Sequence, residues 1–304
     1  MRVTFNTFPD TLLGRLQSLG SEQNKALTQL STGQRIAAPS DDPAAMQRIL
    51  SLRTEKNQNQ QYYRNCTDGL EVSQTTFSTL DQLGKLVGRA SELASNVSGI
   101  TSDAEFKAKY AEINQLIEQG VNVANTKLRG SFLLSGDASA AATKPFAATT
   151  DANGKITAVT YAGSSTSPEM NIAEDTKISV YTTPAENNDV ALALNKLIAM
   201  RDAMDAKSSS AVLTARRDLT EGNTSCEDKL LSAMSRAGSI QYRLENNMKD
   251  LEARYESSEK LISTDADVDF AEATVRLNRS QMAYQAAIQS GAKIQNNSLL
   301  DYLR

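Results

Sequence analysis

Three aspartates alternate with apolar residues in Asp265-Ala266-Asp267-Val268-Asp269, a spacing similar to the start of a calcium-binding loop. An EF-hand loop also needs glycine at its sixth position and a bidentate glutamate at its twelfth. Phe270 and Arg276 stand at those positions. We therefore interpret the aspartates as acids at the N-terminus of a following helix, where they complement its dipole, and expect no metal.

Cys66 and Cys226 are the only cysteines, and the chain has no histidine. Without histidine, neither a Ser-His nor a Cys-His nucleophile can form, and no metal can be held by imidazole. Both cysteines fall in heptad patterns, where a buried cysteine acts as a small apolar residue. A single disulfide between them stays an open alternative. Phosphate-binding and nucleophile-elbow motifs are absent, so we expect no enzyme and no cofactor.

The amino-acid composition further limits the class of protein to which the chain can belong. The 304 residues carry a net charge of −4, which gives no electrostatic footprint for nucleic acid and argues against a polybasic membrane anchor. Only 5% of the residues are aromatic, although 40% are hydrophobic. No run is long and apolar enough to span a membrane, and the N-terminus shows no apolar core of a cleavable signal. Such a chain suits thin helical bundles better than a wide enzyme core.

Periodicity places the helices. Pro39 to Pro43 predicts a helix stop and a new start, with Asp42 as cap and Pro43 in the first turn. We expect helices over about 12–33, 43–98, 102–130 (opened by a Ser102–Glu105 capping box) and 265–304. Before the last of these, helix returns at 190 with a short apolar stripe to 204 and a long one over 226–255, and a break follows at 263–265. Between them, residues 155–161 and 177–181 are typical of short strands.

The predicted fold class is mainly α. It is a long antiparallel helical rod or coiled coil, formed by the N- and C-terminal segments, with a small β-rich inserted domain. The expected divisions are a terminal assembly helix (1–42), the outgoing half of the rod (43–130), the β-rich insert (131–188), the returning half (189–264) and a C-terminal assembly helix (265–304).

The predicted function depends on apolar stripes along the helices at the two ends of the chain. A single helix cannot bury its own stripe, and burying a leucine side chain is worth roughly 1.5–3 kcal/mol. Pairing the two ends hides part of this surface, and neighbouring copies would hide the remainder. The predicted assembly interface comprises Leu12, Leu16, Leu19, Leu30, Leu277, Tyr284, Ile288, Ile294, Leu299, Leu300 and Leu303.

Two motifs near the N-terminus resemble the flagellin superfamily: Ser31-Thr32-Gly33-Gln34-Arg35-Ile36 and Pro39-Ser40-Asp41-Asp42-Pro43-Ala44. The Pro-Ser-Asp-Asp-Pro form is similar to the hook-associated protein 3 branch of that superfamily. The stretches 130–136, 144–146, 193–203, 284–286, 293–294 and 298–303 resemble the same branch at the borders of the insert and at the C-terminus.

This resemblance implies a structural protein that is secreted through the flagellar type III export channel without a cleaved signal and lies in the extracellular flagellum. Members of this branch form a ring of identical copies at the hook–filament junction, between hook-associated protein 1 and flagellin, through coiled-coil packing of their terminal helices. The resemblance also implies a flagellar export chaperone before secretion. Filament flagellin is the alternative, and a cytoplasmic coiled-coil adaptor is a less favoured one.

Overall fold

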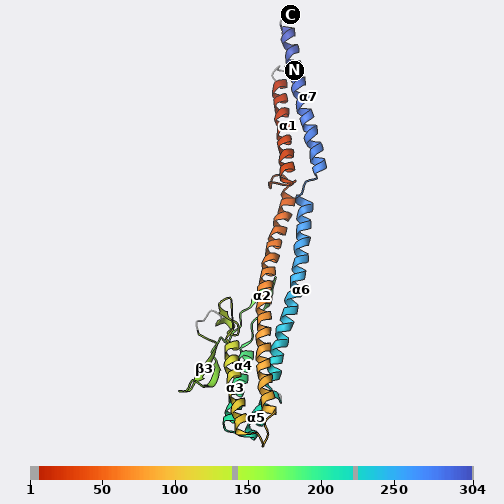
Figure 1. The fold of residues 1–304 in the computed structure, drawn as a ribbon. Coiled ribbons are helices and arrows are strands. Elements are labelled where there is room, and N and C mark those ends of the chain that lie inside the picture. Colours follow the sequence, from red (N-terminus) through yellow and green to blue (C-terminus); the bar gives the residue numbers. More distant parts are fainter. Residues whose placement is uncertain (1–6, 139–142, 222–224, 303–304) are drawn as a thin grey trace. The chain divides into compact units, whose positions relative to one another are not determined.

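The computed structural model describes residues 7–138, 143–221 and 225–302, and the side chains of residues 7–9, 138 and 294 onward are outside this description. The chain divides into two compact units (Figure 1). The terminal unit comprises residues 1–58 and 253–304, and the middle unit comprises residues 59–252. Two long helices, α2 (Pro43–Ser95) and α6 (Cys226–Ala266), contribute to both units.

The terminal unit holds both chain ends. Besides the parts of α2 and α6, it contains α1 (Thr7–Thr32) and α7 (Phe270–Tyr302). The two helices run side by side in opposite directions (Figure 1). A Cβ placed on Gly291 would lie 2.5 Å from Leu12 Cδ2, and one placed on Gly33 would lie 3.7 Å from the Phe270 ring. The N-terminal half of α1 therefore faces the C-terminal half of α7.

Three further helices belong to the middle unit: α3 (Asp103–Ala124), α4 (Pro184–Asp205) and α5 (Ser209–Thr220). Both α3 and α4 begin with a capping box, in which Ser102 pairs with Glu105 and Thr183 pairs with Glu186. These reciprocal bonds satisfy backbone N–H groups that have no partner inside the helix, and so they fix where each helix starts.

The described strands form three antiparallel hairpins. They are β1 (Lys127–Leu128) with β2 (Ser131–Phe132), β3 (Phe146–Thr150) with β4 (Ile156–Tyr161), and β5 (Met170–Ala173) with β6 (Thr176–Ile178). A short 3₁₀ turn, η1, covers Gly136–Ala138. The outer edge of β4 is completed by a side chain, because Asn195 Oδ1 accepts from Val159 N (2.9 Å) and Asn195 Nδ2 donates to Val159 O (2.7 Å).

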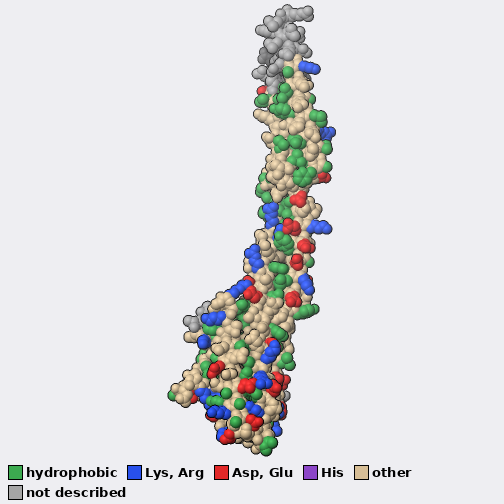
Figure 2. Space-filling view, viewed as in Figure 1, with side chains coloured by type: hydrophobic (Ala, Val, Ile, Leu, Met, Phe, Trp, Pro, Cys, Tyr) green, Lys and Arg blue, Asp and Glu red, His purple; other side chains and the backbone are tan. Residues whose placement is uncertain are grey.

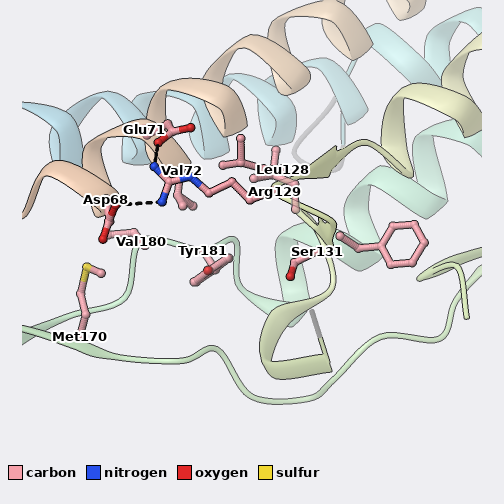
Figure 3. Close-up of a pocket in the computed structure, with 11 residues that line it drawn as sticks. Asp68, Glu71, Val72, Leu128, Arg129, Ser131, Met170, Val180 and Tyr181 are labelled. Carbon is pink, nitrogen blue, oxygen red and sulfur yellow. Dashed lines mark hydrogen bonds and ion pairs between the residues drawn. The ribbon is translucent and has the colours of Figure 1, made fainter. Parts of the chain in front are cut away.

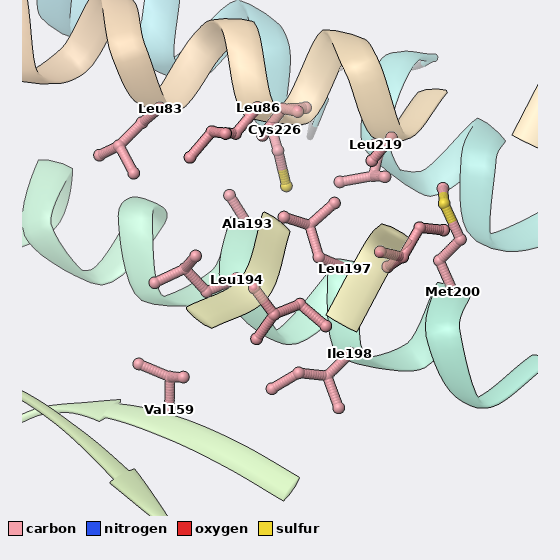
Figure 4. Close-up of a cluster of buried hydrophobic side chains, with 14 of the residues drawn as sticks. Leu83, Leu86, Val159, Ala193, Leu194, Leu197, Ile198, Met200, Leu219 and Cys226 are labelled. Carbon is pink, nitrogen blue, oxygen red and sulfur yellow. The ribbon is translucent and has the colours of Figure 1, made fainter. Parts of the chain in front are cut away.

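The main hydrophobic core lies in the middle unit, where α2 to α6 and the β3–β4 hairpin meet. Figure 4 shows Leu83, Leu194 and Leu197 pointing into it, with Val159 approaching from β4. Arg201 is fully buried beside this core. Its Nη1 donates to Ile156 O (2.8 Å) and Asn114 Oδ1 (3.1 Å), so one guanidinium ties α4 to β4 and α3.

The predicted fold class, mainly α with a small inserted β region, is confirmed. Several boundaries were wrong. Helix α3 ends at Ala124 rather than at Gly130, because a hairpin begins at Lys127, and α4 begins at Pro184 rather than at 190 because Thr183 caps it. The break before the last helix covers residues 267–269, after α6 has run to Ala266. Strands β1, β2, β3 and β5 were not predicted.

Candidate assembly surface

The predicted interface residues lie mostly along the line where α1 and α7 meet. Leu12, Leu16, Leu19 and Leu30 on α1 are half-buried, as are Leu277 and Tyr284 on α7. Gly291 is buried against Leu12. Ile288 is 47% exposed. Ile294, Leu299 and Leu300 belong to α7, but their side chains, like the whole of Leu303, lie outside the described residues. The apolar stripe thus joins the two helices of one molecule.

A second set of apolar side chains in the same helix pair faces solvent. The set consists of Leu13 (58% exposed), Leu27 (49%), Phe270 (57%), Val275 (65%) and Met282 (64%). Figure 2 shows green side chains on the surface of this segment. Sequence reasoning missed these residues because it followed one heptad frame per helix. A second frame was readable, since Leu13 and Leu27 are two heptads apart and Val275 and Met282 are one heptad apart.

The motif residues Arg35 and Ile36 fasten the loop after α1 to the connection between α6 and α7. Arg35 N donates to Ala266 O (2.6 Å), and Arg35 Nη2 donates to Asp265 O (2.8 Å). Val268 N donates to Gly33 O (2.9 Å), where Gly33 adopts a left-handed φ of 71°. Ile36 is buried with Ala45, Ile49 and Ala266.

The second half of the motif, Pro39 to Pro43, orders the turn into α2. Pro39 and Ser40 are exposed. Asp41 Oδ2 accepts from Ala37 N and Ala38 N at 3.1 Å each, while Asp41 Oδ1 lies 2.8 Å from Lys25 Nζ. The bond from Lys25, followed by those from the two backbone amides, lowers the pKa of Asp41 to about 2. Asp42 Oδ1 accepts from Ala45 N (3.0 Å), and α2 begins at Pro43, which confirms the predicted cap.

The aspartates considered for calcium have separate partners. Asp265 lies in the last turn of α6 and binds the Arg48 guanidinium through both carboxylate oxygens, which lowers the pKa of Asp265. Our interpretation of it as an acid at a helix N-terminus was wrong. Asp269 does take that role, because its Oδ1 accepts from Ala271 N and Glu272 N. Across the described residues, no cluster of three metal-binding side chains occurs.

The middle unit contains both cysteines and a small pocket. Cys66 and Cys226 are both buried and free, and burial raises the pKa of each thiol.

A small pocket of the middle unit lies between α2, the β1–β2 turn and the segment after β6 (Figure 3). Arg129, at the tip of the turn, lines the pocket and pairs with Asp68 (2.9 Å) and Glu71, which line it as well. No helix in the described part of the chain is long and apolar enough to cross a membrane.

Two models of known protein families match this chain. The model of the bacterial flagellin N-terminal helical region matches residues 8–139, and that of the bacterial flagellin C-terminal helical region matches residues 225–303. Together they cover α1 to α3, α6 and α7 with the loop motif that joins them. The chain belongs to the flagellin family.

Two flagellins and two solved structures describe the relationship more closely. The phase 1 flagellin of Salmonella naestved and the flagellin of Salmonella budapest are each 33% identical over 142 residues, which is 45% of this chain and 28% of the flagellin. The fold is shared with a Vibrio parahaemolyticus chain described as a flagellar hook-associated protein (TM-score 0.62, 18% identity, 75% of this chain and 100% of that one). It is also shared with FlgL of Bacillus cereus (TM-score 0.55, 21% identity, 73% and 100%).

Proposed function

We propose that the chain is a structural, non-catalytic component of the extracellular bacterial flagellum, which forms a ring of identical copies at the hook–filament junction. The paired terminal helices carry this proposal. Their shared seam is only half-buried, and Leu13, Leu27, Val275 and Met282 remain exposed on the outer faces. Apolar surface of this kind, spread along a two-helix unit, marks a protein interface.

The partners follow from the family and from the fold. A ring at the junction has hook-associated protein 1 on one side and flagellin on the other, and secretion through the flagellar export channel calls for an export chaperone. The fold shared with a hook-associated protein and with FlgL supports the junction role over filament flagellin. The predicted division into terminal assembly helices (1–42 and 265–304), rod halves and insert, and the eleven interface residues, form part of the proposal.

Replacement of apolar residues on α7 by charge tests the assembly role. Leu277→Asp combined with Ile288→Asp should leave the middle unit folded and prevent incorporation into flagella, because two carboxylates would have to be desolvated on packing. The control is Ile100→Asp, which changes a side chain of the middle unit that is 94% exposed. Normal incorporation of the double variant would contradict the assembly surface.

Localisation distinguishes the candidate roles. Immunogold labelling of isolated flagella should place the chain in a narrow band between hook and filament, and gels of those flagella should show it as a trace component. A dominant band along the whole filament would identify a flagellin instead. Label confined to the cytosol of flagellated cells would favour the coiled-coil adaptor.

A further inference from the structure

An acidic and aromatic projection marks the start of α7. Phe270 is 57% exposed, and its ring lies over Gly33. The exposed acids Asp267, Asp269 and Glu272 surround it in sequence. We call these four residues the acidic knob. An aromatic side chain with more than half of its surface in water is costly in a free molecule, and it becomes a strong anchor once a partner covers it.

A groove of opposite character runs between α1 and α7 further along the same helix pair. Small and polar side chains form its floor, since Ala26, Gln29 and Ser280 are 6–7% exposed. Lys25, Arg276 and Arg279 line it as cations, with Glu22 as the one acid. We call it the basic groove.

The three cations that line the basic groove differ in whether they form an ion pair within the molecule. Lys25 pairs with Asp41 at 2.8 Å, and Arg276 pairs with Glu272 at 3.3 Å. Arg279 has no ion pair within the described part of the chain. An incoming carboxylate would therefore find an available guanidinium beside a floor of small side chains, where an aromatic ring has room.

The knob cannot enter the groove of its own molecule. Phe270 and Ser280 lie on one continuous helix, so the rise of α7 holds them about 15 Å apart. Only a second copy can bring the two surfaces together. Such a contact uses different surfaces on the two copies, and repeated head to tail it generates a ring or a helical array.

We propose that the basic groove of one copy receives the acidic knob of a second copy. This inference rests on the proposed assembly function and adds the contact that sets the stagger between neighbouring copies. Phe270 fills the space over Ala26, Ser280 and Ala283, while Asp267 and Asp269 approach Arg279. Complementary charge fixes which neighbour fits and in which direction, because a like-charged alignment is repelled.

Cysteine cross-linking tests the contact directly. Two full-length chains with different tags, one carrying Ala271→Cys and the other Ala283→Cys, are co-expressed in flagellated cells, and isolated flagella are treated with a mild oxidant. A disulfide needs Cα atoms within about 7 Å, and these positions are about 18 Å apart on one helix, so a dimer containing both tags reports the proposed contact. Each variant expressed alone is the control and should yield no dimer, which also accounts for Cys66 and Cys226.

A charge exchange provides the second measurement. Arg279→Asp in the Ala283→Cys chain should reduce cross-linking to the level of the controls, and Asp267→Arg in the Ala271→Cys chain should restore it. Tagged chains present in flagella without a mixed dimer would overturn this contact and leave the proposed function intact. Absence of the unsubstituted chain from flagella would overturn the proposed function, and this contact with it.

Discussion

Replacement of Asp41 by asparagine or alanine should separate the two tasks of this carboxylate in the loop between α1 and α2. Asparagine keeps an oxygen for Ala37 N and Ala38 N but loses the charge that attracts Lys25, whereas alanine loses both. A carboxyl whose pKa falls from 3.8 to about 2 contributes about 2.4 kcal/mol to the free energy of unfolding when unscreened. Lys25 is 55% exposed, and solvent screening reduces the total to about 1–1.5 kcal/mol.

The dependence on pH has a defined sign. Because the pKa of Asp41 is lower in the folded chain than its ordinary 3.8, the carboxylate stabilises the fold above pH 4, and this stabilisation is lost as the pH falls toward 2. We expect Asp41→Asn to lower the free energy of opening by about 0.5–1 kcal/mol at pH 7, since it removes mainly the exposed ion pair. Asp41→Ala should lower it by about 1–2 kcal/mol, since two backbone donors also lose their acceptor.

Hydrogen exchange at residues 35–45 is the suitable measurement, because it reports the opening of this loop even if the terminal and middle units unfold separately. Lys25→Met is the matched variant. Combined with Asp41→Asn in a double-mutant cycle, it should show a coupling of about 0.5–1 kcal/mol that disappears below pH 2. Equal protection of this loop in Asp41→Ala and in the unsubstituted chain would refute the assignment of Asp41 as the residue that orders the turn.

Three other predictions concern single sites. Gly291→Leu should destabilise the α1–α7 pair by about 1–3 kcal/mol, because the new side chain would overlap Leu12, and hydrogen exchange in α1 should rise while that in the middle unit stays constant. Arg201→Met should destabilise the middle unit by about 1–3 kcal/mol in thermal unfolding, since Ile156 O would lose its buried donor. An unchanged melting temperature would contradict the role of Arg201 in tying α4 to β4. Cys66 and Cys226 should resist alkylation at pH 8 in the folded chain and react in urea, because burial raises the pKa of both thiols.

Helix starts that depend on only a few neighbouring residues could be predicted from the sequence. The cap at Asp42, proline in the first turn of α2 and the Ser102–Glu105 capping box all lie where their spacing predicts, because each satisfies backbone groups within one turn. The capping box at Thr183 and Glu186 carried an equally local signal, which the apolar periodicity from Val190 onward obscured. Strand β4 was predicted from its own residues, whereas the missed strands β1, β2, β3 and β5 are only two to five residues long, too short for a periodic pattern to show.

The sequence by itself determined the helical periodicity, the positions of several helix starts and the presence of apolar stripes at both ends, because these depend on spacing along one chain. The tertiary structure decided which stripe each helix uses internally and which it leaves exposed, and it paired Arg48 with Asp265 across 217 residues. It also showed that the Arg35–Pro43 motif, known from the sequence only as a family resemblance, fastens the α1–α2 loop. Contacts between distant segments depend on how helices pack together, and the spacing of residues within each helix leaves several such packings open.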